Sequence, residues 1–144
     1  MKRWLQEITN LEGIEGVFIS SGRAKIIAKL GLDLNDPQLE ALALYTLRIV
    51  AAFHLKTQKI NEIEFYWKNL FIIGRVAGDF LVITIFTTPK VLALLRITLN
   101  VTLSNLLEDK KFMRVIKEQA ADKNILLEKG EMTEIEKNLI TKLK

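Results

Sequence analysis

The stretch EIEFYWKNLFIIGRVAGDFLVITIF, residues 62–86, decides the fold. Its first part, within residues 61–68, alternates apolar and polar side chains, which predicts a strand with one polar-leaning face. Residues 70–76 and 80–86 are almost entirely apolar and flank the turn signal Ala-Gly-Asp. Short apolar runs around a turn are typical of a hairpin whose strands are covered on both faces. This stretch alone therefore predicts three strands of one sheet.

The residues before this stretch add a helix and a second hairpin. Residues 2–10 carry their apolar side chains on one side, which predicts a short amphipathic helix. Residues 17–20 and 24–30 flank Ser-Ser-Gly-Arg, a turn signal, and predict two further strands.

Two long helices are each expected to begin at a proline. Asp36 is the predicted N-cap of the first, with Pro37 at the first helical position, and this helix should run to about Thr57. Thr-Pro opens the second in the same way, over residues 88–107.

This order of elements predicts an α+β fold. We expect a five-stranded, mostly antiparallel sheet with two long helices on one face, a short N-terminal helix and a C-terminal helical appendage. The domain should cover residues 1–108, and the strongly charged residues 109–144 should form a C-terminal helical extension. One extension helix is predicted over residues 110–120 and another from Thr133, where a capping box begins. The second helix carries an apolar stripe predicted to bind a partner, made of Ile135, Leu139 and Leu143.

Composition excludes several kinds of active site. The chain has 144 residues, a net charge of +4, no cysteine and a single histidine, His54. Disulfides, thiolate zinc sites and cysteine nucleophiles are therefore excluded, and a histidine-based metal site or a Ser-His-Asp triad would depend on His54 alone. With no cofactor fingerprint either, we expect a protein that is not an enzyme and has no cofactor. The N-terminus does not resemble a signal peptide and Arg48 interrupts the most apolar run, so we expect a cytoplasmic protein that does not insert into membranes.

The helix beginning at Asp36 is apolar on more than one side. At about 100° per residue it carries two stripes, separated by Glu40, Arg48 and His54. The first stripe, which the sheet should bury, contains Leu39, Leu42, Ile49, Val50 and Phe53. The second stripe, which needs another cover, contains Leu44, Leu47, Ala51 and Leu55. Its three leucines represent roughly 5–9 kcal/mol of burial. Either the chain's own tail or a second copy could supply that cover, and we favour a homodimer.

Other charged residues in this region have alternative interpretations. Arg48 is expected to pair with Glu40 or a partner carboxylate, rather than to act as a catalytic arginine offered to a GTPase. His54 is expected at an interface rim or helix end, with a pH-sensitive contact as the alternative. Glu62 and Glu64 are expected to keep an edge strand soluble, rather than to serve acid–base chemistry.

Three segments carry a family resemblance. They are LEGIEGVFISSGR at residues 11–23, the opening stretch at residues 62–86, and TPKVLALLR at residues 88–96. In order and apolar pattern these resemble the roadblock (dynein light chain) family of longin-like domains, over about residues 2–107. The Asp-Gly usual in the family's first turn is Ser-Gly here, and the C-terminal tail has no counterpart in the minimal fold.

The resemblance implies a homodimer in which the middle helices pack antiparallel and the third strands pair into a ten-stranded sheet. It also implies a non-catalytic protein, because many family members are platforms for Ras-like GTPases or adaptor subunits. We therefore expect a homodimeric regulator or scaffold that binds a small Ras-like GTPase. The expected dimer interface contains Leu44, Leu47, Arg48, Ala51, Leu55, Ile63 and Phe65. The alternatives are a nucleic-acid or polyanion-binding accessory protein, favoured only by the pI of about 9.3, and a ligand-sensing module.

Overall fold

The computed structural model describes most of the chain. The described residues are 2–31, 33, 35–55, 60–67 and 69–128. The predicted helix from Thr133 and its stripe of Ile135, Leu139 and Leu143 lie outside them.

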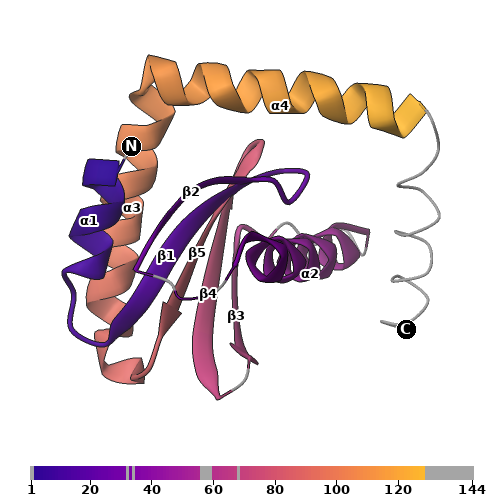
Figure 1. The fold of residues 1–144 in the computed structure, drawn as a ribbon. Coiled ribbons are helices and arrows are strands. Elements are labelled where there is room, and N and C mark those ends of the chain that lie inside the picture. The colour runs from indigo at the N-terminus through magenta and orange to yellow at the C-terminus, as the bar shows by residue number, and fades with distance from the viewer. Residues whose placement is uncertain (1, 32, 34, 56–59, 68, 129–144) are drawn as a thin grey trace.

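One five-stranded sheet forms the centre of the molecule (Figure 1). Its strands are β1 (Ile14–Ser21), β2 (Ile26–Leu30), β3 (Glu62–Trp67), β4 (Leu70–Ala77) and β5 (Phe80–Phe86). Their spatial order is β2-β1-β5-β4-β3, and every neighbouring pair is antiparallel. The predicted α+β class and both hairpins are confirmed. The first hairpin differs in one detail, because buried Ala24 has a positive φ of 65° and belongs to the turn, so β2 starts two residues later than predicted.

The helices are found in the predicted order. They are α1 (Lys2–Thr9), α2 (Asp36–Leu55), the short 3-10 turn η1 (Pro89–Val91), α3 (Leu92–Glu108) and α4 (Lys110–Glu128). Thr88 opens this segment as predicted, but it caps η1, where its hydroxyl accepts a hydrogen bond from the Lys90 N–H, whereas the N-cap of α3 is Val91, which makes no side-chain capping bond. The N-cap of α2 is Asn35 and not the predicted Asp36. Asn35 and Gln38 exchange side-chain to backbone hydrogen bonds of 3.0 and 3.1 Å, and Asp36 instead pairs with Lys29 at 2.7 Å.

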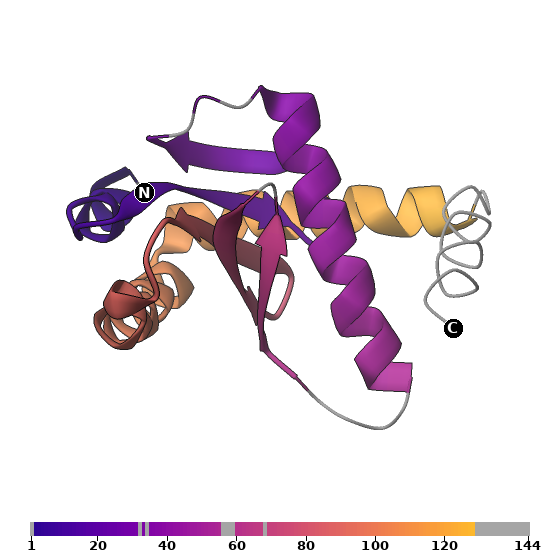
Figure 2. The ribbon, with the colours of Figure 1, turned by 90° about the horizontal axis from the view of Figure 1, so that it is seen from below.

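The prediction that both long helices cover one face is wrong, because α2 and α3 lie on opposite faces of the sheet (Figure 2). Neighbouring residues of a strand point to opposite faces, so a strand that is apolar throughout needs cover on both sides. In β1, Phe18 packs with α2 while Val17 and Ile19 pack with α1 and α3. The same alternation in β5 divides the core into an α2-side cluster and an α3-side cluster.

Gly74 of β4 determines how closely α2 packs on the sheet. A Cβ at this position would lie 2.8 Å from the Cγ2 atom of Thr46 in α2. Thr46 is buried, and its hydroxyl donates a hydrogen bond of 2.9 Å to the Leu42 carbonyl. Glycine therefore allows a close approach of helix and strand that any larger residue would obstruct.

The first turns of α4 belong to the core. Asp109 accepts a hydrogen bond from the Phe112 N–H, and this bond holds the pKa of the Asp109 carboxyl below its ordinary value. Phe112 and Ile116 are buried in the α3-side cluster, and the Phe112 ring lies edge-on to Phe80 with 4.8 Å between centroids. The helix is longer than the predicted residues 110–120 and leads from the end of α3 towards the α2 side of the molecule (Figures 1 and 2).

Candidate interaction surface

The parts of α2 that the sheet does not cover are apolar and accessible. Tyr45, Phe53 and Leu55 are exposed by 48, 41 and 67%. Within the predicted second stripe, Leu44 and Leu47 are half-buried against the α2-side cluster, whereas Ala51 and Leu55 are exposed. The stripe is therefore partly covered by its own domain.

The first stripe of α2 is buried over most of the helix, as predicted. Leu39, Leu42 and Val50 are in the core, and Ile49 is half-buried. Phe53 remains accessible near the end of the helix, so apolar surface continues onto the last turn.

Tyr45 connects α2 to the edge of the sheet. Its ring lies edge-on to that of Phe65 in β3, with 5.4 Å between centroids. Tyr45 and Leu47 lie about 160° apart around the helix axis. Arg48 lies between them, on the side of the helix farthest from the sheet. The structure thus brings the predicted interface residue Phe65 together with Tyr45, which the sequence analysis did not single out. The leucine stripe lies on the opposite flank of the helix.

β3 is an edge strand of the sheet. Within the described residues it is hydrogen-bonded along one side, to β4, over the six positions from Glu62 to Trp67. The predicted alternation is confirmed, since Phe65 packs with the α2-side cluster while Glu62 and Glu64 meet α3 on the other face. Ile63, opposite Gly74 in the register, is half-buried. An edge with unpaired backbone groups can accept another strand.

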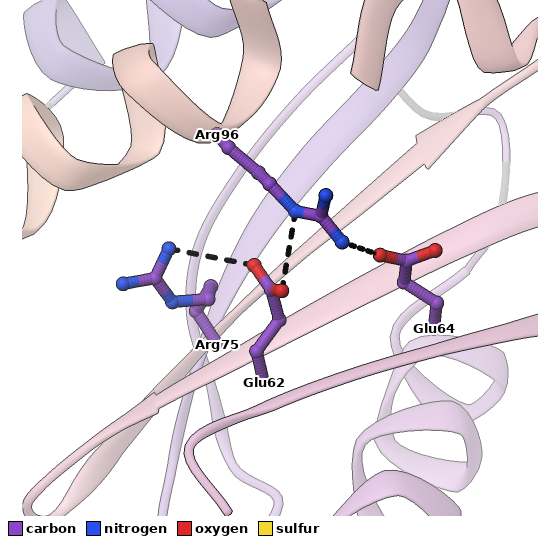
Figure 3. Close-up of polar contacts among 4 residues, drawn as sticks. All are labelled: Glu62, Glu64, Arg75 and Arg96. Carbon is purple, nitrogen blue, oxygen red and sulfur yellow. Dashed lines mark hydrogen bonds and ion pairs between the residues drawn. The ribbon is translucent and has the colours of Figure 1, made fainter. Parts of the chain in front are cut away.

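A cluster of four charged side chains lies on the α3 face of this edge (Figure 3). Arg96 of α3 contacts Glu62 through Nε at 3.2 Å and Glu64 through Nη2, and Arg75 of β4 contacts Glu62 at 3.5 Å. The side chains of Arg75 and Glu62 are 16 and 25% exposed. The side chains of Arg96 and Glu64 are more accessible, with 44 and 41% exposed. The two carboxylates are therefore paired with arginines, and the pairs join β3 to β4 and α3.

Sequence reasoning missed Arg96, although one signal was available. It is the only charged residue between Lys90 and Glu108, in a helix otherwise made of apolar and small polar residues. A lone charge in such a helix indicates a specific partner, because burying part of an unpaired charge is costly.

The remaining predicted residues lie near the end of α2. His54 is exposed in the last turn, and its Nε2 is 3.2 Å from the Ile60 carbonyl, to which it donates. This agrees with the predicted place at a helix end. Arg48 is half-buried, and its pairing with Glu40 stays a prediction. Among the described residues, no three acidic or histidine side chains gather closely enough to hold a metal ion.

The outer face of α3 is a second accessible apolar surface. Leu94, Ile97 and Val101 are exposed by 54, 62 and 50%. The segment Pro89–Glu108 is long and apolar enough to cross a membrane, judged by length and composition alone. Four leucines on its inner side are nevertheless buried in the α3-side cluster, as in a core helix of a folded domain: Leu95, Leu99, Leu103 and Leu106.

The strand order β2-β1-β5-β4-β3, with α2 on one face and α1 and α3 on the other, defines the class: the chain has the roadblock/LC7 fold, a longin-like α+β fold. Its structure is similar to a roadblock/LC7 domain from Streptomyces avermitilis, with a TM-score of 0.62, 7% identity, and coverage of 74% of this chain and 93% of that one. It is also similar to MglB of Myxococcus xanthus, with a TM-score of 0.57, 18% identity, and coverage of 72% and 85%. A third similar structure, described as MglB with a tetrameric arrangement, gives a TM-score of 0.59, 16% identity, and coverage of 81% and 88%. No family model matches the sequence, and no curated protein matches it significantly.

Proposed function

We propose that the protein is a non-catalytic, homodimeric regulator or scaffold that binds a small Ras-like GTPase in the cytoplasm. One observation carries this proposal: an accessible apolar helix, α2, lies directly beside an edge strand, β3, with Tyr45 and Phe65 in contact between them.

The exposed apolar side chains of α2 favour a partner on energetic grounds. Fully burying an aromatic or leucine side chain contributes about 1.5–3 kcal/mol, so Tyr45, Phe53 and Leu55, each about half-exposed, would each gain roughly half of that. Of the three, Tyr45 lies on the flank beside β3, where a partner at that edge would cover it, and exposed apolar surface at such a place is typical of an association site. Aromatic side chains are common at the centre of such sites.

A second copy of the chain fits both features of this surface. The backbone groups on the outer side of β3 would pair with those of a second β3, and the two α2 helices would pack across the same axis. The roadblock resemblance implies this arrangement, with a ten-stranded sheet, and the tetrameric arrangement of a similar MglB structure supports self-association. Ile63 and Phe65 would then lie beneath the paired helices. Arg48 would lie on the side of each helix that is farthest from the sheet.

The mechanism we propose is positioning. Two α2 helices held on a continuous sheet would offer a rigid face to the switch segments of a GTPase. A surface that binds one nucleotide state more tightly than the other shifts the partner's equilibrium by that difference in affinity, and no catalytic group is required. The C-terminal residues Ile135, Leu139 and Leu143 are proposed to add a contact to the partner.

Sedimentation velocity of the wild type and of two matched variants tests the homodimer. Tyr45→Glu places a charge in the proposed interface, whereas Ile97→Glu places the same charge on the accessible face of α3. We expect the wild type and Ile97→Glu to sediment as dimers at micromolar concentration and Tyr45→Glu as a monomer. A monomeric wild type, or a Tyr45→Glu variant as dimeric as Ile97→Glu, would contradict the proposal.

The GTPase partner is tested by affinity capture from the native host. Immobilised wild type and Tyr45→Glu are each incubated with lysate containing GDP or a non-hydrolysable GTP analogue. We expect a Ras-like GTPase to be enriched by the wild type in one nucleotide state, and the purified GTPase then to bind the dimer directly. Enrichment of no GTPase in either state would lead us to abandon this part of the proposal.

A further inference from the structure

We infer that Arg96 is the counter-charge that allows β3 to pair with β3 of a second copy. The inference rests on the proposed homodimer and concerns the α3 face of its seam. There, Arg96 contacts both Glu62 and Glu64, which project from an edge strand (Figure 3).

Symmetry places the acidic residues of both copies on one face of the seam. If both α2 helices lie on the same face of the joined sheet, the two-fold axis is perpendicular to that sheet. Since side chains alternate along a strand, a residue can then face only a residue of the same parity in the second copy. Glu62 and Glu64 of one copy therefore share a face with Glu62 and Glu64 of the other.

The central registers of such a pairing all bring carboxylates together. A seam centred on Ile63 sets Glu62 opposite Glu64 of the second copy, and a seam centred on Glu64 sets that residue opposite itself. A seam centred on Phe65 makes the two copies of Glu64 diagonal neighbours, still within reach of long side chains. Like charges directly opposite each other oppose strand pairing.

Arg96 is better placed than Arg75 to remove this repulsion. Arg75 is the direct cross-strand neighbour of Glu62 and contacts that residue at 3.5 Å. Arg96 contacts Glu62 at 3.2 Å and also reaches Glu64, the residue nearer the middle of β3. With both arginines the four side chains are neutral in each copy. Without Arg96 each copy brings one uncompensated negative charge to the seam.

The test measures the dimer dissociation constant by sedimentation velocity in 50 and 500 mM NaCl. Arg96→Met removes the charge and keeps most of the side-chain volume. Arg114→Met removes the same charge from an exposed position on α4 and serves as the matched control. A triple variant combines Arg96→Met with Glu62→Gln and Glu64→Gln, which removes the repulsion together with its counter-charge.

We expect Arg96→Met to raise the dissociation constant about tenfold in 50 mM NaCl and clearly less in 500 mM NaCl, where salt screens the repulsion. Arg114→Met should leave it unchanged, and the triple variant should return it to within about threefold of the wild type. Thermal unfolding of each variant identifies any that is not folded, and the triple variant then provides the comparison.

Two results would overturn the inference while leaving the homodimer in place. One is a wild-type dimer that Arg96→Met and Arg114→Met affect equally. The other is a triple variant that dimerises no better than Arg96→Met, because Arg96 would then act through packing. A monomeric wild type would overturn both the homodimer and the role of Arg96.

Discussion

Replacing Gly74 with alanine tests how closely α2 packs on the sheet. The new Cβ would lie 2.8 Å from Cγ2 of Thr46, 3.4 Å from Cγ2 of Ile63 and 3.7 Å from Cδ1 of Leu81. The first distance is too short for two carbon atoms, and the other two are tight or ordinary contacts. Thr46 cannot easily rotate away, because it is buried and its hydroxyl is bonded to the Leu42 carbonyl. The helix must therefore move or the strand must bend.

The expected cost follows from two opposing effects. Adding a methyl group to a packed core costs about 1–3 kcal/mol. Alanine is favoured over glycine in a strand by about 0.5–1 kcal/mol, which offsets part of that cost. We therefore expect Gly74→Ala to lower the free energy of unfolding by about 1–2 kcal/mol, and the melting temperature by roughly 3–8 °C.

A double-mutant cycle with Thr46→Ser isolates the contact. Serine keeps the hydroxyl and removes the obstructing methyl, at a cost of about 0.8 kcal/mol when made alone. In the double variant the obstruction is gone, so Gly74→Ala should cost nothing further and the coupling should reach about 1–2 kcal/mol. The measurement is urea unfolding followed by circular dichroism at one fixed protein concentration, since association changes apparent stability. If the costs of Gly74→Ala and Thr46→Ser add to within about 0.5 kcal/mol in the double variant, the proposed close contact between β4 and α2 is refuted.

Three further variants test other parts of the structure. Phe112→Ala should lower the free energy of unfolding by about 3–5 kcal/mol because it empties a core position, whereas Lys117→Ala, exposed on the same helix, should change it by less than about 0.5 kcal/mol in thermal unfolding. Asn35→Ala should lower it by about 1 kcal/mol through loss of the α2 N-cap, again measured by urea unfolding. Asp109 has a pKa that is lower in the folded state, so its contribution is complete above its ordinary pKa of about 4 and is lost as the pH falls through the folded value. The urea midpoint of Asp109→Asn should therefore fall less than that of the wild type between pH 5 and pH 3.

Much of the fold could be predicted because the relevant signals are local. The alternation of apolar and polar residues in residues 61–68 predicted β3. The apolar runs on either side of Ala-Gly-Asp predicted β4 and β5. The start of α2 was harder, because Asn35 and Asp36 are both good N-cap residues. The choice depends on Gln38, whose side chain returns to the Asn35 N–H and completes the capping box.

The placement of α2 and α3 could not be read from periodicity. Periodicity shows which side of a helix is apolar, but it does not show which face of the sheet that side meets. The apolar runs of β4 and β5 did indicate strands covered on both faces, and two long helices could satisfy this only by lying on opposite sides.

The candidate surface was predicted in part for a similar reason. Ile63, Phe65 and the apolar character of α2 follow from local patterns. The contacts of Tyr45 with Phe65 and of Arg96 with Glu64 join residues 20 and 32 positions apart in the chain, and no local pattern reports them. Only the folded arrangement shows which flank of α2 adjoins the edge strand.

The two faces of β3 would contribute differently to a dimer. On the α2 face, Phe65 and Tyr45 offer apolar area, which supplies affinity. On the α3 face, the paired charges contribute little apolar area. They instead disfavour incorrect registers of the β3–β3 pairing, as charged groups commonly do at interfaces. A slip of one residue would turn Glu62 and Glu64 of one copy, together with the arginines that pair with them, towards the apolar α2 face of the other. The alternation that identified β3 in the sequence would therefore also restrict how two copies of the strand can pair.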